Sequence, residues 1–503
     1  MRIIGIIDIG SNSLRLVVAQ VSLDNTFRII DELKESVRLG ESVGTTGKLS
    51  SAKIDTALET LKLFQELCHA LGVQNIYVIA TEAVRRASNK YEFIRCVKKR
   101  LNLDVQVLSG IEEAYYDYLG TINTLNFSDA ILMDIGGSST ELALIKNREF
   151  QEAISFPFGA INLSKEYNLS TAIDPVLERK LNEFLTDNFK KLKWLSGELP
   201  LIGIGGSFRN ICKIDKRQRD YPLESVHNYH LTAHSIAGLY QRLKSLSYEE
   251  RAEIKGLSKD RADIIVGPLA EISNLLSITK IQNIYVSGSG LREGLLFKTI
   301  FKDKPVVPDV LDYSLCTTMK NFHLNEGHAH HVWKLVFQLF CGLKDLIPQR
   351  EHHLNILKTA ALLHDCGIQI SYYDHHKHSF YMILNSNIYG LTQKEILMAA
   401  WIASLHRKEE SKMTASYRKL LTAEELALIQ KLGLLLRIGE SMDRRQNGSI
   451  QKVECEITSK SVSLMFSSNT NSFLESSDAL TSAPLFKKIF KKQLIINTKL
   501  HET

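Results

Sequence analysis

Two segments of the sequence combine an aspartate with glycine and serine, and both have the chemistry of a phosphate-binding turn. They are Asp8–Ser13 (DIGSNS) and Asp134–Ser139 (DIGGSS). Glycine lets backbone N–H groups approach an anion closely, and serine and asparagine add further donors. An aspartate beside these donors would repel phosphate unless a cation lies between them, and Mg²⁺ binds one or two carboxylates together with phosphate oxygens. The two segments therefore predict a phosphate cleft that holds Mg²⁺ through Asp8 and Asp134.

The two segments also occupy equivalent places in the chain. Each lies between two strand-like runs, and alignment of Asp134 with Asp8 also pairs Gly136 with Gly10. One acidic Gly-Ser turn alone is weak evidence, and similarity between two β-hairpins can arise by chance. The match in both turn and flanking strands favours a duplicated fold with a cleft between its halves.

Glu113 is a candidate general base. Ser109 followed three residues later by Glu112 is the capping-box pattern of a helix start, which would engage Glu112 with the backbone of Ser109. Glu113 would then lie on another face of the helix, free to accept a proton from water. On these residues alone, Glu113 could instead complement the helix dipole. The planar guanidinium of Arg85 suits a phosphate oxygen, and a surface salt bridge is its alternative role.

The chain must contain several domains to position these residues. Its 503 residues, of which 44% are hydrophobic and 23% charged, are too many for one hydrophobic core. We expect an α/β architecture with four parts: two related α/β domains over residues 1–125 and 126–305, a mainly helical domain over 306–447, and a small α/β domain over 448–503. The prolines in Lys302–Pro308 indicate a linker before the helical part.

Composition argues against several classes of protein. The net charge of +6 is spread over short basic runs, so we expect no specific nucleic-acid binding. The sequence has no apolar run of ~18 residues, so we expect no membrane span. The seven cysteines include no CxxC pair, which argues against a disulfide framework or a cysteine zinc site. No signal-peptide pattern is present, and a cytoplasmic enzyme is expected.

The helical part carries a second set of possible ligands. A distant histidine, a His-Asp pair and a late acid resemble the pattern of HD-type metal phosphohydrolases, and the candidates are His328, His364, Asp365 and either Asp443 or Glu440. Imidazole with carboxylate suits a second divalent metal that activates water. The alternative is a relic site that only shapes a channel or a dimer contact. His375–His378 could line a path for a polyanion or form a polar loop.

Six motifs, in this order, resemble the Ppx/GppA family of exopolyphosphatases and guanosine pentaphosphate phosphohydrolases. They are GIIDIGSNSLRL, ATEAVRRASN, SGIEEA, MDIGGSSTEL, GIGGSFRN and VSGSGLREG, and they cover about residues 1–300. The resemblance implies two ribonuclease-H-like halves of the actin-like ATPase superfamily, followed by an HD-like domain. It also implies a homodimer.

The same resemblance implies roles for individual residues. Glu113 would be the catalytic base, while Asp134 and Glu141 would hold the metal and orient water. The expected phosphate contacts are Ser11, Asn12, Ser13, Arg85, Gly136, Gly137, Ser138 and Ser139, with Gly206 and Ser207 of a third Gly-rich turn that could also be an ordinary helix cap. Ser138 departs from the family, which commonly has a third glycine there, but serine is also a donor.

The expected reaction is Mg²⁺-dependent release of terminal phosphate from inorganic polyphosphate, from the 5′ end of guanosine pentaphosphate, or from both. The sequence does not choose between these substrates. Three alternatives are a nucleotide-dependent kinase of the same superfamily, a regulatory protein that binds guanosine alarmones without turnover, and a phosphohydrolase that acts through its HD-like domain.

Overall fold

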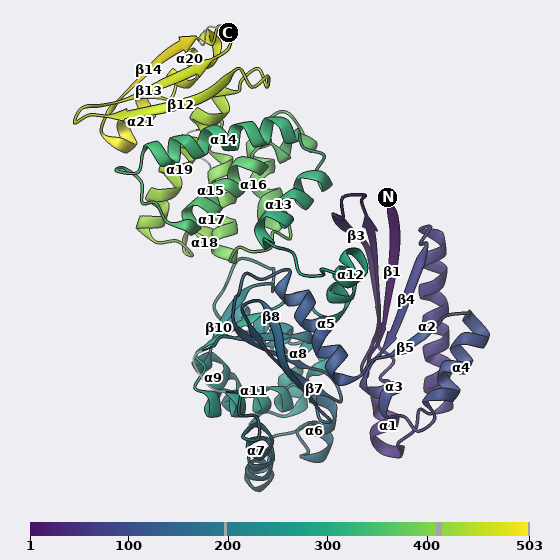
Figure 1. Cartoon of the computed structure of the whole chain (residues 1–503). Coiled ribbons are helices and arrows are strands. Elements are labelled where there is room, and N and C mark those ends of the chain that lie inside the picture. The colour runs from purple at the N-terminus through teal and green to yellow at the C-terminus, as the bar shows by residue number, and fades with distance from the viewer. Residues whose placement is uncertain (196–198, 409–414, 501–503) are drawn as a thin grey trace. The chain divides into compact units, whose positions relative to one another are not determined.

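The structure, a computed structural model, describes residues 1–195, 199–408 and 415–500. These residues form two compact units, which divide between Val310 and Leu311 (Figure 1). Among the described helices, none is both long enough and apolar enough to cross a membrane.

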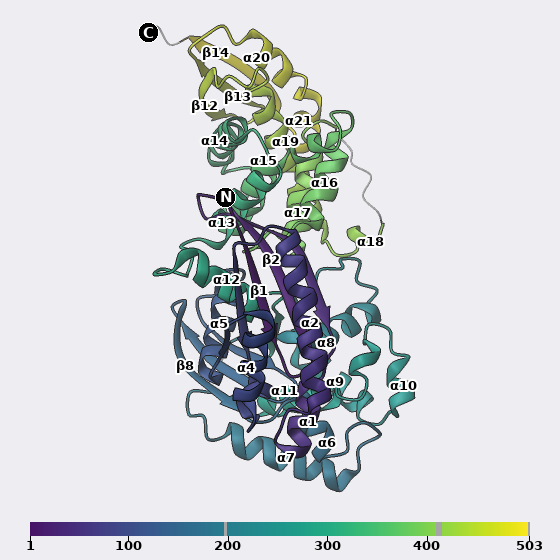
Figure 2. The same ribbon diagram turned by 90° about the vertical axis from the view of Figure 1, so that its right-hand side faces the viewer.

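The first sheet of the N-terminal unit has the strand order β3-β2-β1-β4-β5. Its strands are β1 (Arg2–Ile9), β2 (Leu14–Val21), β3 (Phe27–Glu35), β4 (Asn75–Ala80) and β5 (Val105–Val107). The first three form an antiparallel meander, and β4 and β5 run parallel to β1. The accompanying helices are α1 (Leu39–Thr46), α2 (Ser51–Ala70), α3 (Glu82–Arg86) and α4 (Lys90–Leu101). Figures 1 and 2 show α2 lying along one face of the sheet, where Leu61 and Phe64 share a core with Ile7 and Leu16.

The second sheet repeats this topology, with the order β10-β11-β9-β6-β7-β8. Its strands are β6 (Ala130–Ile135), β7 (Thr140–Lys146), β8 (Glu149–Phe156), β9 (Leu201–Ile204), β10 (Tyr229–Thr232) and β11 (Asn283–Val286). Again an antiparallel meander, β6-β7-β8, is followed by two parallel strands, β9 and β11. The helices after this meander are α6 (Ala160–Glu166), α7 (Pro175–Phe189), α8 (Gly205–Gln218), α9 (Ala233–Leu243), α10 (Tyr248–Ala252), η1 (Lys259–Arg261) and α11 (Val266–Thr279). The predicted duplicated α/β fold is confirmed.

Two helices cross between the halves. Helix α5 (Gly110–Ile122) precedes the second meander, and its Tyr118 and Leu119 pack with Leu132 and Ala143 of the second sheet. Helix α12 (Leu291–Phe301) ends the second half, but its Phe297 ring lies 5.6 Å from the Phe27 ring of β3. Each helix therefore packs against the sheet of the other half. Helix α5 follows the strands of the first sheet and covers the second, and α12 follows the strands of the second sheet and covers the first.

Helices α5 and α12 touch at their backbones through glycine. A Cβ added to Gly294 would lie 1.8 Å from the Tyr116 carbonyl oxygen, and one added to Gly120 would lie 2.2 Å from the Gly290 carbonyl oxygen. Because these neighbours are backbone atoms, rotation of a side chain cannot relieve the clash. We therefore expect Gly294→Ala to lower the free energy of unfolding by about 3 kcal/mol, as measured by urea denaturation.

Gly238→Ala is the matched control for this substitution. Gly238 is an exposed glycine inside α9, and a Cβ there would meet no heavy atom of the described residues within 4 Å. Alanine should stabilise that helix by about 1 kcal/mol. Equal stability of the Gly294→Ala protein and the wild type would contradict the close helix contact.

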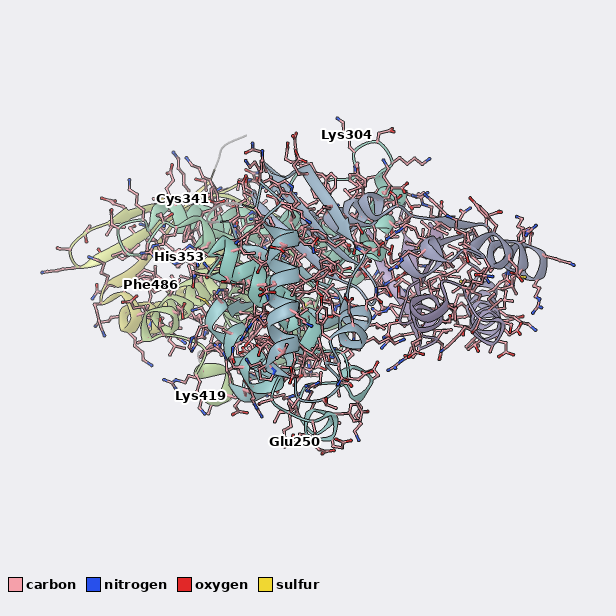
Figure 3. The ribbon with its side chains drawn as sticks, turned by 90° about the horizontal axis from the view of Figure 1, so that it is seen from below. Glu250, Lys304, Cys341, His353, Lys419 and Phe486 are labelled. Carbon is pink, nitrogen blue, oxygen red and sulfur yellow. The ribbon has the colours of Figure 1, made fainter. Side chains whose placement is uncertain are left out.

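The C-terminal unit begins with helices and ends with a small sheet. Its helices are α13 (Val310–Asn321), α14 (Glu326–Gly342), α15 (Glu351–Leu363), η2 (Cys366–Gln369), α16 (His375–Asn385), α17 (Gln393–Ser404), α18 (Ala415–Arg418) and α19 (Ala423–Met442). The following elements are β12 (Ile450–Ile457), β13 (Ser461–Ser468), α20 (Phe473–Leu480), α21 (Ala483–Phe490) and β14 (Gln493–Leu500). One core runs from Leu311 to Leu494, and it includes Phe486 of α21, labelled in Figure 3. The core is thus continuous across the predicted boundary at 447/448.

Candidate active site

The two acidic turns meet in the N-terminal unit. Both turns close in the same way: the Gly10 N–H donates to the Ser13 carbonyl over 3.2 Å, and the Gly136 N–H donates to the Ser139 carbonyl over 2.9 Å. A Cβ placed on Gly137 would lie 3.2 Å from the Cβ of Ser11, so the turns approach each other closely. They line one cleft together with Glu113.

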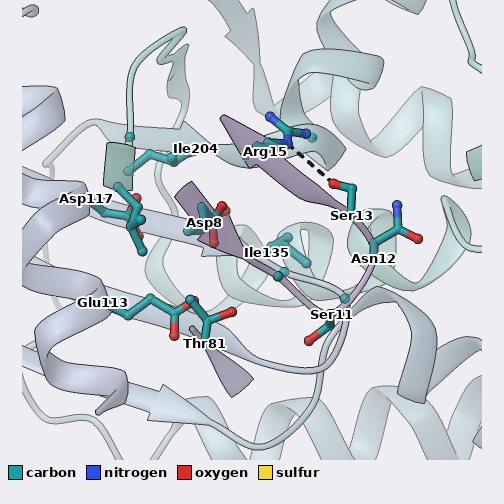
Figure 4. A pocket seen from close by; sticks show the side chains of 18 of the residues that line it. Asp8, Ser11, Asn12, Ser13, Arg15, Thr81, Glu113, Asp117, Ile135 and Ile204 are labelled. Atoms are coloured by element: carbon teal, nitrogen blue, oxygen red, sulfur yellow. Dashed lines mark hydrogen bonds between the residues drawn. The ribbon is translucent and has the colours of Figure 1, made fainter. Parts of the chain in front are cut away.

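The strands after the turns give the two halves different charges. Arg15 of β2 pairs with Asp8 of β1, whereas Glu141 of β7 pairs with Asp134 of β6 at the equivalent position. The first hairpin therefore supplies one carboxylate and one guanidinium, and the second supplies two carboxylates. Figure 4 shows Arg15 with its 3.4 Å hydrogen bond to the Ser13 hydroxyl.

Glu113 is positioned by the start of α5. The Glu112 N–H donates to Ser109 Oγ over 3.2 Å, and the Ser109 N–H donates to Glu112 Oε2 over 2.7 Å, which confirms the predicted capping box. Glu113 is therefore on a different face, 8% exposed, and its Oε2 accepts a 3.0 Å hydrogen bond from Arg85 Nη1. Asp117, one turn later on the same face, points into the cleft beside it (Figure 4).

Burial raises the pKa of every carboxyl in this group. It raises the pKa of Glu113 to about 8, although the Arg85 guanidinium acts in the opposite direction, and it raises the pKa of Asp134 to about 6. The pKa of Asp8 is also raised, and those of Asp117 and Glu141 are raised well above the ordinary value, because burial and neighbouring carboxylates both disfavour ionisation. A positive partner in this cleft would relieve the repulsion.

Unpaired oxygens indicate where that partner would lie. Within the described part of the chain, buried oxygens of these acids without a hydrogen-bond partner are Asp8 Oδ1, Asp117 Oδ1 and Oδ2, Asp134 Oδ1 and Glu141 Oε2. Buried polar atoms are normally hydrogen bonded, so an unpaired cluster of carboxylate oxygens calls for a cation. A hard, oxygen-preferring ion such as Mg²⁺ fits this donor set.

Four arginines complete the lining of the cleft. Arg15 comes from β2, Arg209 from α8, Arg261 from η1 and Arg292 from α12. Burial lowers the pKa of Arg15 only to about 10, so this side chain stays charged near neutral pH. Carboxylates gathered near Glu113 and guanidinium groups in the same cleft would suit a metal-bound polyanion.

The start of α8 adds backbone donors. Gly205 has φ +86°, and a Cβ there would lie 2.1 Å from Asp134 Oδ1, so only glycine fits. None of the side chains described at this end caps α8, and its first residues, Gly205 and Gly206, line the cleft. An uncapped helix N-terminus favours an anion.

Most of the residues predicted for the site line this cleft. They are Asp8, Ser11, Asn12, Ser13, Glu113, Asp134, Gly136, Gly137, Ser139 and Gly206. The other predicted residues do not line the cleft. Arg85 contacts Glu113 and Glu82, and Glu141 accepts a 2.6 Å hydrogen bond from Ser155. Ser138 faces Gly40, and the Ser207 hydroxyl lies 3.3 Å from the Ile135 carbonyl oxygen.

Asp117 and the four arginines were not among the predicted site residues. Asp117 had a usable signal, because it follows Glu113 by four residues in a predicted helix. The arginines come from four separate elements, and neighbouring residues give no local sign that they meet.

The histidines predicted as ligands also lie together, in the C-terminal unit. His328, His364 and Asp365 form one group of possible metal ligands. Asp443 lies behind His328, with its Oδ2 2.8 Å from the ring Nδ1. The other candidate acid, Glu440, forms ion pairs with Arg407 at 3.2 Å and Arg444 at 3.4 Å.

Comparison with protein-family models identifies the family. A model described as the Ppx/GppA phosphatase family matches residues 16–302, and one described as Ppx/GppA phosphatase, domain III, matches residues 310–488. The chain belongs to the Ppx/GppA phosphatase family. The resemblance inferred from the motifs is confirmed, and this member carries both parts.

Individual relatives agree with this assignment. The Ppx/GppA chain is 28% identical over 459 residues to a guanosine-5′-triphosphate,3′-diphosphate pyrophosphatase of Pseudoalteromonas translucida, which covers 88% of each chain. The crystal structure of the Aquifex aeolicus family member is 30% identical, covers 60% of this chain and 98% of its own, and has a TM-score of 0.54. An exopolyphosphatase from Cytophaga hutchinsonii is 26% identical, covers 61% and 100%, and has a TM-score of 0.57.

Proposed function

We propose that this Ppx/GppA phosphatase hydrolyses the terminal phosphoanhydride bond of inorganic polyphosphate, the 5′-terminal phosphate of guanosine pentaphosphate, or both. The observation that carries the proposal is the convergence of Glu113 with Asp8, Asp117 and Asp134 in one cleft between two phosphate-type turns. The names of two relatives, one an exopolyphosphatase and one a pyrophosphatase of guanosine triphosphate diphosphate, support both substrates.

Asp8, Asp134 and Glu141 are the proposed Mg²⁺ ligands, and Asp117 is a fourth candidate. Each of the four has at least one buried oxygen that accepts no hydrogen bond from the described residues. A bound Mg²⁺ would neutralise charge on the reacting phosphate oxygens. The acids would hold that ion, and the neighbouring turns would bind the phosphate.

Glu113 is the proposed general base. Its carboxylate lies in the cleft, and its pKa is raised by burial, so it is a stronger proton acceptor than an exposed glutamate. Arg85 holds Oε2 at 3.0 Å and thereby fixes the direction in which the carboxylate faces. Attack by water on the terminal phosphorus then forms a new P–O bond, breaks the bridging P–O bond so that the shortened phosphate chain leaves, and transfers a proton from that water to Glu113.

Backbone and arginine donors are the proposed phosphate binders. The turn at Ser11–Ser13, Gly137 and the start of α8 line the cleft, and their backbone N–H groups are the proposed donors. Four guanidinium groups extend this surface and would hold several phosphates of one chain. Because phosphoryl transfer depends mainly on positioning and charge stabilisation, these contacts would contribute to the reaction together with Mg²⁺ and Glu113.

A phosphate-release assay with two substrates tests the proposal. Long-chain polyphosphate and guanosine pentaphosphate are each incubated with the full chain, with Mg²⁺ and with a chelator. We expect phosphate from at least one substrate, and only in the presence of the metal. Binding of guanosine pentaphosphate without phosphate release would instead support the regulatory alternative.

The pH dependence of kcat/KM should respond to Arg85. The positive charge of Arg85 lowers the pKa of Glu113, so its removal in Arg85→Gln raises that pKa further. Activity needs the unprotonated carboxylate, and the acidic limb of the profile should therefore move to higher pH. Arg85→Lys keeps the charge and should leave the limb near its wild-type position. A limb that stays in place in Arg85→Gln would show that Arg85 does not act through Glu113.

The expected cytoplasmic location and homodimeric state stay predictions. Light scattering coupled to size-exclusion chromatography of the full chain would measure the assembly.

A further inference from the structure

Five side chains of the C-terminal unit converge at the ends of four helices. His328 lies near the start of α14, His364 and Asp365 follow α15, His375 begins α16, and His406 lies just after α17. The four imidazoles are between 1% and 6% exposed. The cleft of the N-terminal unit uses none of them.

Each imidazole is fixed through its Nδ1 atom. His364 and His375 each donate to a backbone carbonyl at 2.8 Å, of Ala361 and Tyr372 respectively. His406 donates to the Ala403 carbonyl at 2.5 Å in the same way. Since a carbonyl can only accept, Nδ1 carries the proton in these rings and Nε2 keeps its lone pair. This is the arrangement of metal-binding histidines.

The fourth ring is held by a carboxylate. His328 Nδ1 lies 2.8 Å from Asp443 Oδ2, and the other oxygen of Asp443 accepts a 2.9 Å hydrogen bond from the Gly448 N–H. Asp443 is therefore a positioning residue that orients His328. A carboxylate behind a metal-binding histidine also makes the ring a stronger ligand.

The four Nε2 atoms surround the two oxygens of Asp365. Oδ2 lies 3.8 Å from His328 Nε2 and 3.6 Å from His364 Nε2. Oδ1 lies 3.4 Å from His375 Nε2 and 3.5 Å from His406 Nε2. Each oxygen thus belongs to a separate set of three ligand atoms, and one carboxylate joins the two sets.

The spacing within the sets fits metal ions. His375 Nε2 and His406 Nε2 are only 2.9 Å apart, an approach that requires either an extra proton or a cation shared by both lone pairs. Bonds of ~2.1 Å at right angles on one ion place two nitrogens about 3 Å apart. In the other set, the described residues leave His328 Nε2 and His364 Nε2 without a hydrogen-bond partner although both are buried.

We propose that the C-terminal unit binds two divalent transition-metal ions bridged by Asp365, one held by His328 and His364 and the other by His375 and His406. Nitrogen-rich sites with one carboxylate suit Mn²⁺, Fe²⁺, Co²⁺ or Zn²⁺ and are poor sites for Mg²⁺. Three protein ligands per ion leave positions for water or a phosphate oxygen, as in metal sites that act on a substrate. The chain would then separate its metals by donor type, with Mg²⁺ among carboxylates and a transition metal among imidazoles.

Metal stoichiometry tests this proposal. The full chain is stripped with a chelator, returned to buffer with excess Mg²⁺ to fill the carboxylate cleft, and titrated with Mn²⁺. Bound Mn²⁺ is counted by mass spectrometry after removal of free metal, and exchange coupling is sought by electron paramagnetic resonance. We expect two Mn²⁺ per chain with the spectrum of a coupled pair.

Variants assign the ligands. His406→Ala should reduce the count by one and remove the coupled spectrum, and Asp365→Ala should remove both. His330→Ala is the control, because His330 is an exposed histidine on the same helix as His328. Circular dichroism checks folding, and His406→Gln replaces His406→Ala if that variant does not fold.

Two outcomes would overturn the proposal. One is a wild-type count of one Mn²⁺ or none in excess Mg²⁺, and the other is an unchanged count in both the His406 and the Asp365 variants. The Asp134→Asn protein should still bind two Mn²⁺. Loss of Mn²⁺ in that protein would show that the metal sits in the carboxylate cleft.

Discussion

Replacement of Glu113 by glutamine is expected to lower kcat for phosphate release by about 10²–10⁴-fold. Glutamine has the same shape but cannot accept a proton from water. The fold should survive, because burial already disfavours the charge on Glu113 and raises its pKa to about 8. The assay follows phosphate release with Mg²⁺ at saturation for both substrates.

In the metal-free protein, the buried Glu113 carboxyl makes the fold less stable as pH rises. A carboxyl whose folded pKa is raised binds more protons folded than unfolded, so its contribution to stability falls as pH rises from about 4.5 to about 8. Above this window Glu113→Gln should melt at the same temperature as the wild type or higher. Glu112→Gln, at the exposed capping position, is the activity control. A Glu113→Gln enzyme with near-normal turnover would refute the assignment of the base.

Asp134→Asn is expected to weaken Mg²⁺ binding at least 10–100-fold, roughly the loss seen when even a supporting contact of a metal ligand is removed. Asp134 Oδ1 is buried and accepts no hydrogen bond from any described residue, so the ion would be its main partner. The Mg²⁺ concentration for half-maximal activity should rise, and kcat should fall. A titration of activity with Mg²⁺ measures both.

Thermal melting gives an independent readout for the same variant. Mg²⁺ should raise the melting temperature of the wild type, because a ligand that binds only the folded state stabilises it. The rise should be much smaller in Asp134→Asn, while the exposed Asp187→Asn control should behave as the wild type. An equal rise in all three proteins would mean that Asp134 does not bind the ion.

Local patterns predicted the parts of the site that depend on one segment. The capping box that separates Glu112 from Glu113 uses neighbouring residues, and the structure confirms it. The repeated Asp8 and Asp134 turns lie on matching hairpins, which predicted the duplicated fold. Asp117 was missed, although its spacing from Glu113 placed it on the same helical face.

Features that depend on side-chain direction in three dimensions were not predicted. Arg15 and Arg209 meet only because β2 and α8 close the same cleft. Asp443 was expected beside the metal, but a helix position alone does not fix which nitrogen of His328 an acid reaches. His375 belongs to a stretch that could have been a polar loop, whereas it begins α16 and faces His406.

The crossing of α5 and α12 couples the unfolding of the two halves of the N-terminal unit. If the chain were divided near residue 125, α5 would remain with the first sheet and α12 with the second. Each helix would then be separated from the apolar sheet face that it covers. Each fragment would expose an apolar sheet face to water. The two halves of the N-terminal unit should therefore unfold in one cooperative transition, although each has its own sheet.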